Sequence, residues 1–158
     1  YHLGEHGLWQ KMSLFENSAR VPLIIYDPRA RGNGRAVPQP VELVSLHATL
    51  ADSCGLTIPR TDGQTFRTLL QAPDTRWYRP ALTQVSRGTP TATGEKGKPG
   101  FMGYSVRTER YRYTEWDGGK QGAQLYDYES DPKELANLAA DPKHAATVAK
   151  LKALLPRK

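Results

Sequence analysis

Cysteine is almost absent from this chain of 158 residues, which has a single one at Cys54. One cysteine excludes an internal disulfide, but it says little about the compartment in which the protein works. Long hydrophobic runs are missing too: no apolar stretch approaches the ~18 residues of a transmembrane helix, and no charged-then-apolar leader opens the sequence. We therefore expect the chain neither to span a membrane nor to carry its own signal peptide.

Acidic residues are the scarcer charged type, with 16 Asp and Glu against 22 Lys and Arg, which gives a formal net charge of +6. Such an excess is typical of general solubility, or of attraction for a polyanion such as nucleic acid or a sulfated or phosphorylated substrate. No run of four basic residues occurs, and no recognition-helix or zinc-finger spacing is present. Nucleic acid is therefore the weaker alternative, and we expect none as a partner.

Apolar residues are not abundant either, at 38% of the chain, whereas Gly 14 and Pro 12 indicate many irregular connections. The sequence nevertheless opens at once on a dense group of chemically active side chains within its first eleven positions: Tyr, two His, Glu, Trp and Lys. Such a dense group of side chains is typical of an active-site loop, yet nothing before it supplies the rest of a site. We interpret the chain as a piece of a larger enzyme.

The hydrophobic pattern predicts an α/β fold. The apolar run 20–26 predicts a strand buried on both faces, as in a parallel sheet covered by helices. Helical spacing follows over 43–54, with Gly55 just beyond the C-terminus, and again over 142–155, capped by Asp141. Further strands are expected at 80–85, at two positions within 103–116 that share one solvent-exposed face, and at 124–128. We place a boundary near 72–80, which gives domains at 1–75 and 76–158.

His2, Glu5 and His6 form the spacing H-x-x-E-H, which resembles an inverted zinc-binding motif on a helix. Gly4 and Gly7 interrupt that helix, and each glycine costs it about 1 kcal/mol. The alternative is that both histidines form hydrogen bonds within a structured loop. Both interpretations remain open at this stage, although the glycines favour the loop.

Lys11 follows Trp9 closely and precedes the apolar run. A lysine held rigidly in that place can direct its point charge at an anionic group. The alternative is an ordinary solvated surface lysine. Neither composition nor spacing decides between the two.

Long stretches of the sequence resemble the sulfatase family of the alkaline-phosphatase-like superfamily. GEHGLWQKMSLFENSARVPLIIY is similar to the family segment GEHGLWxKxxLFExxxRVPLII, and VELVSLHATLADSCGLTIP is similar to a family helix. In that helix, Ser45 stands where Asp is usual and His47 where Tyr is usual. MGYSVRTERYRYTEW resembles iduronate-2-sulfatase-like enzymes in particular, and QLYDYESDPKELANLA matches LYDLxxDPxExxNLA.

This resemblance implies a fold and a role for Lys11. Residues 1–75 would be the C-terminal part of the sulfatase α/β core, at the end of its mixed sheet. Residues 76–158 would form an antiparallel sheet-and-helix subdomain. In the family, the lysine at the position of Lys11 contacts the sulfate oxygens, where a cation stabilises charge in the sulfuryl transition state.

The resemblance also implies groups that this chain does not supply. Family members bind a catalytic calcium through an Asp-His-Gly motif that would directly precede Tyr1, so we expect no metal ligands here. Their nucleophile is a formylglycine made in a C/S-x-P-x-R motif, whereas Cys54 is followed by Gly-Leu-Thr. We therefore expect the chain alone to be inactive, because loss of nucleophile and metal costs ~10⁴-fold or more in rate.

Substrate contacts are expected from two places. In iduronate-2-sulfatase-like enzymes a lysine from the loop before the MGYS strand approaches the uronate carboxylate, and Lys96 and Lys98 lie in the corresponding loop. Solvated loop lysines are the alternative for both. His6, in the opening loop, is the other candidate for substrate binding.

The resemblance leads to three functional hypotheses. The first is the C-terminal part of a sulfatase that acts on sulfated sugars together with the N-terminal remainder of the same protein. The complete protein would then be exported to the periplasm, the extracellular space or a lysosome. The second is a phosphonate or phosphate ester hydrolase of the same superfamily. The third is a non-catalytic module that binds polyanions.

Overall fold

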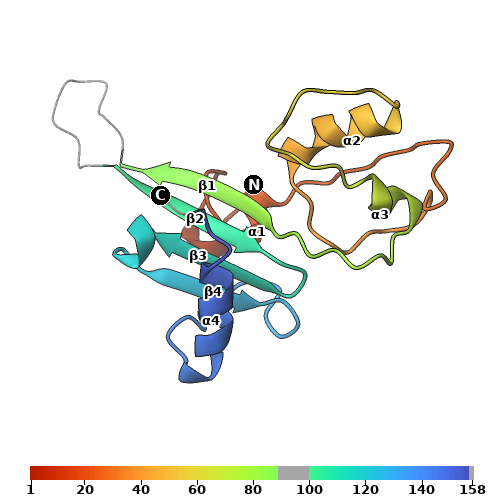
Figure 1. Cartoon of the computed structure of the whole chain (residues 1–158). Helices are drawn as coiled ribbons and strands as arrows, with labels where there is room; N and C mark the ends of the chain where they lie inside the picture. The colour runs from red at the N-terminus through yellow and green to blue at the C-terminus, as the bar shows by residue number, and fades with distance from the viewer. Residues whose placement is uncertain (89–99, 157–158) are drawn as a thin grey trace. The chain divides into compact units, whose positions relative to one another are not determined.

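The computed structural model describes residues 1–88 and 100–156, which fall into two compact units. Unit 1 combines Tyr1–Val21 with Leu82–Lys158, and unit 2 is Pro22–Ala81 (Figure 1). The division after Ala81 lies close to the expected boundary, but the opening segment groups with the C-terminal half. The prediction of domains at 1–75 and 76–158 concerns the complete protein and stays a prediction.

Of the helices and strands that the sequence pattern predicted, all are present except the strand over 20–26. The α-helices are α1 (Glu16–Ala19), α2 (Leu46–Ser53), α3 (Arg67–Gln71) and α4 (Ala145–Lys152). The strands are β1 (Ala81–Arg87), β2 (Phe101–Arg107), β3 (Tyr111–Trp116) and β4 (Ala123–Asp127). The 3-10 turns are η1 (Glu5–Gly7), η2 (Leu43–Ser45), η3 (Asp117–Gly119) and η4 (Pro142–His144). No described helix is both long enough and apolar enough to cross a bilayer.

The four strands of unit 1 form one sheet in the order β1-β2-β3-β4 (Figure 1). β2 and β3 pair antiparallel, with Val106 opposite Tyr113, and β3 and β4 pair antiparallel, with Tyr113 opposite Leu125. Because paired residues share a face, these three side chains lie on one side of the sheet. A tight turn joins β2 and β3, in which the Thr108 amide donates to the Tyr111 carbonyl at 2.8 Å.

The terminal helix α4 covers this apolar face. Leu151 and Leu155 join Val106, Tyr113 and Leu125 in the buried core of unit 1. The predicted cap is confirmed, because the Asp141 side chain accepts a 2.9 Å hydrogen bond from the Lys143 amide and Pro142 begins the turn. The helix predicted over 142–155 is therefore present, with a 3-10 first turn, and it ends at Lys152.

The opposite face of the sheet, which we expected to be solvent-exposed, is buried. Arg112 is only 2% exposed, and its neighbours Ser105 and Thr114 are 0% and 1% exposed. The opening segment lies over this face: Leu14 lies beside Gly103, and the ring of Phe15 lies 6.1 Å from that of Tyr126. The alternation in 103–116 correctly predicted two strands. The prediction that their polar face contacts solvent is wrong, because its polar groups pair with polar groups from elsewhere in the chain.

Unit 2 is built around α2 and α3. The Thr49 hydroxyl donates to the Ser45 carbonyl at 2.8 Å and accepts from the Phe66 amide at 3.1 Å, so one buried side chain joins the two helical segments. Gly55 follows α2 with φ 68°, as the predicted left-handed C-terminal residue.

The strand predicted over 20–26 is not formed. The segment is extended without a paired strand, Ile24 is 92% exposed and Tyr26 is 77% exposed. A buried strand needs backbone partners on neighbouring strands, and none of the described residues supplies them. The prediction of a buried strand over 20–26 is therefore wrong for this chain.

Candidate functional site

The opening loop is folded as a set of tight turns. Gly4 and Gly7 have φ values of 119° and 69°, and His6 lies between them at 56°, so the segment contains a 3-10 turn and no α-helix. The Glu5 carboxylate accepts a 2.6 Å hydrogen bond from the Leu3 amide, which lowers the pKa of Glu5. The interpretation of H-x-x-E-H as a zinc-binding motif on one face of a helix is therefore wrong for this segment.

The two histidines of the loop have structural contacts. His2 is fully buried, and its Nε2 lies 2.7 Å from the Ser13 hydroxyl, while its Nδ1 has no partner among the described residues. The His6 ring stacks on Phe15 with centroids 3.8 Å apart and planes 3° from parallel. These contacts agree with the loop interpretation. The role of His6 in substrate binding stays a prediction.

Lys11 is exposed and carries an uncompensated charge. Its Nζ lies 5.6 Å from the centre of the Tyr1 ring, and no carboxylate within the described part of the chain pairs with it. The next residue, Met12, has φ 74°, a left-handed conformation that is unusual for a side chain of this size. Such strain persists only where the surroundings impose it, and it is frequent at functional sites.

Ser13 fixes the end of this strained turn. Its amide donates to the Ser18 hydroxyl at 3.2 Å, and its own hydroxyl accepts from the Phe15 amide at 3.3 Å while also contacting His2. Lys11 is thus attached to a short, heavily hydrogen-bonded segment. This segment keeps the lysine stem close to the sheet of unit 1.

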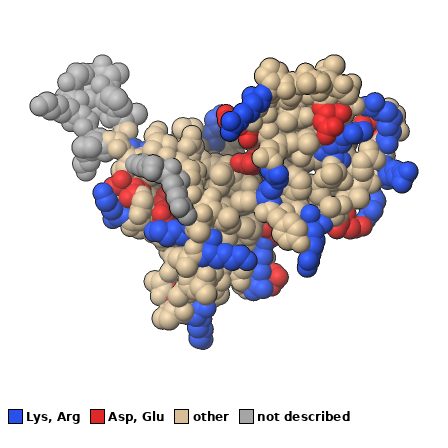
Figure 2. All heavy atoms as spheres, viewed as in Figure 1, with Lys and Arg blue, Asp and Glu red and all other residues tan. Residues whose placement is uncertain are grey.

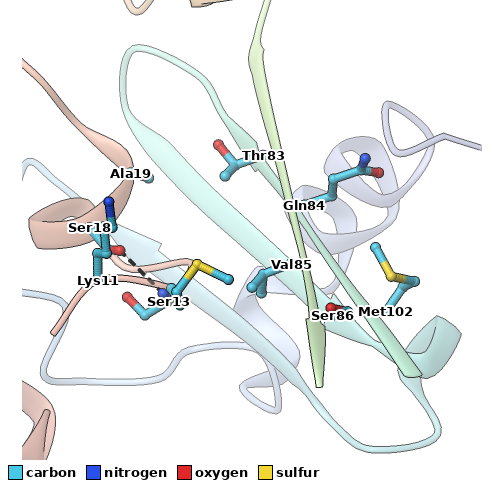
Figure 3. A pocket seen from close by; sticks show the side chains of 10 residues that line it. Lys11, Ser13, Ser18, Ala19, Thr83, Gln84, Val85, Ser86 and Met102 are labelled. Carbon is cyan, nitrogen blue, oxygen red and sulfur yellow. Dashed lines mark hydrogen bonds between the residues drawn. The ribbon is translucent and has the colours of Figure 1, made fainter. Parts of the chain in front are cut away.

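An open pocket of about 440 Å³ lies beside Lys11. Figure 3 shows its two sides: Lys11, Ser13 and Ser18 on the opening segment, and Thr83 and Val85 projecting from β1 toward that segment. The pocket has apolar surface from Val85 and hydroxyl groups from both sides. Lys11 is its one charged side chain within the described ranges 1–88 and 100–156.

A second group of charged residues, on the buried face of the sheet, was not predicted as a site. The Arg112 guanidinium donates to the carboxylate of Glu16 and forms an ion pair with the carboxylate of Glu134 at 2.7 Å. Glu134 is fully buried, and its other oxygen accepts from the Glu16 amide at 2.7 Å. Arg107 adds a longer ion pair to Glu16 at 3.4 Å. We call these four residues and Tyr128 the arginine cluster.

The contacts within the arginine cluster keep Glu16 and Arg112 charged and Tyr128 neutral. Burial by itself would raise the pKa of Glu16, but the charges of Arg112 and Arg107 outweigh it and lower that pKa. Burial opposes the charge of Arg112, yet Tyr128 and the two carboxylates raise its pKa. Burial also raises the pKa of Tyr128, whose hydroxyl accepts from Arg112 at 3.0 Å and donates to Glu134. All three groups therefore keep one protonation state over the neutral range.

The described residues do not offer a metal site. No group of three or more His, Cys, Asp or Glu side chains gathers closely enough to hold an ion in ranges 1–88 and 100–156. The described residues therefore provide no set of ligands that fits calcium. Calcium and formylglycine stay predictions about the complete protein. Cys54 is exposed at the end of α2. Lys96 and Lys98 lie outside the described residues.

Surface charge does not single out a further site. Lys and Arg are spread over the visible face and interspersed with Asp and Glu (Figure 2). Several cations are paired locally, as Arg110 is with Asp127 at 2.7 Å and Lys152 with Glu115 at 2.5 Å. A broad polyanion-binding face is therefore not evident in this view.

Comparison with known proteins places this fold. The family described as "N-sulphoglucosamine sulphohydrolase, C-terminal" matches residues 4–158. The structure is similar to the phosphonate monoester hydrolase of Agrobacterium radiobacter, with a TM-score of 0.74 and 30% identity over 96% of this chain and 32% of that chain. The fold is thus of the alkaline-phosphatase-like class. The chain belongs to the C-terminal family of N-sulphoglucosamine sulphohydrolase and other sulfatases.

Relatives of known name agree with this family. A sulfatase of Formosa agariphila is 28% identical over 99% of this chain and 28% of its own length. Iduronate 2-sulfatase of Mus musculus is 29% identical over 95% of this chain and 38% of its own length. The chain therefore spans well under half of each relative. The resemblance to iduronate-2-sulfatase-like enzymes, and to their C-terminal portion only, is confirmed.

Proposed function

We propose that this chain is the C-terminal part of an enzyme that hydrolyses sulfate esters of sugars, and that Lys11 binds the sulfate group. The observation that carries the proposal is the unpaired Lys11 beside an open pocket, in a chain whose family match runs from residue 4 to residue 158. The sugar is suggested by the name of the iduronate 2-sulfatase relative.

Lys11 has the properties that the reaction requires. When water cleaves a sulfate ester, a new S–O bond forms, the bond to the sugar oxygen breaks, and the sugar leaves as an alcohol. Charge shifts onto the sulfuryl and leaving oxygens on the way. A lysine Nζ offers three hydrogen-bond donors and a full charge, and the hydrogen-bonded turn at Ser13 holds its backbone in place beforehand.

Other groups of the reaction are proposed to come from the rest of the protein. The N-terminal remainder would supply the formylglycine nucleophile and the calcium ligands, and this chain alone would be inactive. Within residues 1–88 and 100–156, no three His, Cys, Asp or Glu side chains gather closely enough to hold the calcium. Lys96, Lys98 and His6 remain proposed substrate contacts, and an exported or lysosomal location remains part of the same proposal.

Substitution of Lys11 tests the role of the residue. In the complete protein, Lys11→Gln should lower kcat/KM for a sulfated monosaccharide by about 100-fold or more, because one donor to the developing charge is lost. Lys120→Gln is the matched control, since Lys120 is an exposed lysine of the same unit that does not line the pocket. Equal activity of the Lys11 and Lys120 variants would contradict the proposed role.

A phosphonate monoester hydrolase is the second candidate, because the solved structure with a TM-score of 0.74 carries that name. Its reaction also places negative charge on oxygens that a lysine can bind, so Lys11 does not separate the two functions. The ratio of kcat/KM for a phenyl sulfate and a phenyl phosphonate, measured on the complete protein, does so. A ratio in favour of the phosphonate would replace the first proposal by this one.

A further inference from the structure

The pocket beside Lys11 has a second wall whose chemistry differs from that of the lysine. Thr83 lies on β1, is partly exposed, and projects toward the opening segment, on the same side of the strand as the buried Val85 (Figure 3). Gln84 points to the other side of β1 in the same view. Of the side chains that β1 places in this pocket, Thr83 is therefore the hydroxyl directed at the segment that carries Lys11.

Two hydroxyls that line the pocket, those of Thr83 and Ser18, are available to a ligand. No hydrogen bond of the Thr83 hydroxyl is present among the described residues, and it is partly exposed, so water or a ligand must satisfy it. The Ser18 hydroxyl accepts from the Ser13 amide, which leaves its own proton free to donate. Both therefore offer hydrogen bonds within a pocket whose apolar surface includes Val85.

We infer that Thr83 binds a neutral hydroxyl or ring oxygen of the substrate and so determines specificity for sulfated sugars over other sulfate esters. The inference rests on the proposed function. One cation, neutral hydroxyls and apolar surface match an ester with one anionic group on a hydroxylated ring: Lys11 takes the anion, Thr83 takes the polyol, and Val85 contacts ring C–H groups. A second anion would find no further cation among the described lining residues.

Thr83→Val in the complete protein tests this assignment, because valine keeps the shape and removes only the hydroxyl. The KM and kcat of wild type and Thr83→Val are compared on a panel of N- and O-sulfated hexoses. They are also compared on 4-nitrophenyl sulfate, which has the ester but no sugar. Loss of one neutral hydrogen bond should raise KM for the best sugar sulfate about fivefold with little change in kcat. The KM for 4-nitrophenyl sulfate should stay the same. Thr147→Val, on α4 and away from the pocket, is the matched control.

Each outcome has one meaning. An equal KM for the sugar in wild type and Thr83→Val, with both esters turned over, overturns the assignment of Thr83 and leaves the proposed function intact. Parallel increases in KM for both esters also overturn it, since they indicate a general disturbance of the Lys11 pocket. Turnover of the aryl ester but of no sugar on the panel overturns the sugar substrate of the proposed function and, with it, the assignment of Thr83, but keeps sulfate ester hydrolysis. No turnover of either ester by the wild type overturns the proposed function itself.

Discussion

The Glu16 carboxylate accepts a hydrogen bond from the guanidinium of Arg112, which lies 96 residues further along the chain. This contact joins the opening segment to the middle of the sheet in unit 1. Glu16 follows Lys11 by only a few residues. The opening segment therefore carries both the candidate catalytic cation and the carboxylate that anchors the segment to the sheet. The stability of this anchor therefore bears directly on the position of Lys11.

Neutralising Glu16 should loosen the opening segment. Glu16→Gln removes a charged acceptor from Arg112, which is only 2% exposed, at a cost of about 2 kcal/mol. In the complete protein, amide hydrogen exchange in residues 13–19 should then accelerate about 30-fold. Glu109→Gln serves as the control, because Glu109 is exposed in the β2–β3 turn. Unchanged exchange in 13–19 would show that the ion pair contributes nothing to the anchor.

A double-mutant cycle should reveal coupling within the arginine cluster. Arg112→Met alone leaves Glu16 and the fully buried Glu134 without their shared cation, so we expect a loss of about 3–5 kcal/mol. Adding Glu16→Gln to that variant removes one of the unpaired charges and should restore 1 kcal/mol or more, by order of magnitude. The free energy of opening from hydrogen exchange measures both effects. Strictly additive losses would mean that the two residues act independently.

The anchor should weaken in acid. The folded state lowers the pKa of Glu16 below its ordinary 4.5, so the stabilisation is present above that value and is lost as pH falls through the lower, folded pKa. Protection factors of residues 13–19 should therefore fall below about pH 4.5 in the wild type, by linkage. Glu16→Gln should flatten this dependence. A wild-type profile that stays level to lower pH would contradict a lowered pKa of Glu16.

Gly103 should not tolerate a side chain. A Cβ there would lie 2.4 Å from the Trp116 ring and 2.9 Å from Leu14, where the opening segment packs on the sheet. Gly103→Ala should therefore lower stability by about 1–3 kcal/mol, measured by thermal unfolding of the complete protein. The smaller ring of Trp116→Phe should recover part of that loss in the double variant. A loss that Trp116→Phe leaves unchanged would place the strain elsewhere.

The regular elements were predictable because each depends on short-range pattern. Helical spacing with Gly55 beyond it fixed the end of α2, and alternation over 103–116 identified β2 and β3. The arginine cluster was not predictable in this way. An arginine on every second position of a strand has the same pattern whether water or a carboxylate faces it, and the partners Glu16 and Glu134 lie far away in sequence.

The candidate site was predicted in part for a similar reason. Lys11 could be singled out from the order Trp, Lys and apolar run, and from the resemblance to sulfatases. Thr83 could not, because a threonine in a predicted strand carries no signal until the neighbouring segment is known. The positive φ of Met12 has no signature in the sequence either, since methionine rarely adopts this conformation.

The exposed apolar segment 20–26 supplies a last prediction, about the complete protein. Ile24 is 92% exposed here, although the apolar pattern of its segment predicts a strand that is buried on both faces. If the N-terminal remainder pairs with this segment, Ile24→Lys places a charge in a buried sheet and should lower the Tm of the complete protein by roughly 5 °C or more. Leu56→Lys, in an irregular loop of the same unit, should change Tm little. Equal Tm values for the two variants would mean that the segment faces solvent in the complete protein as well.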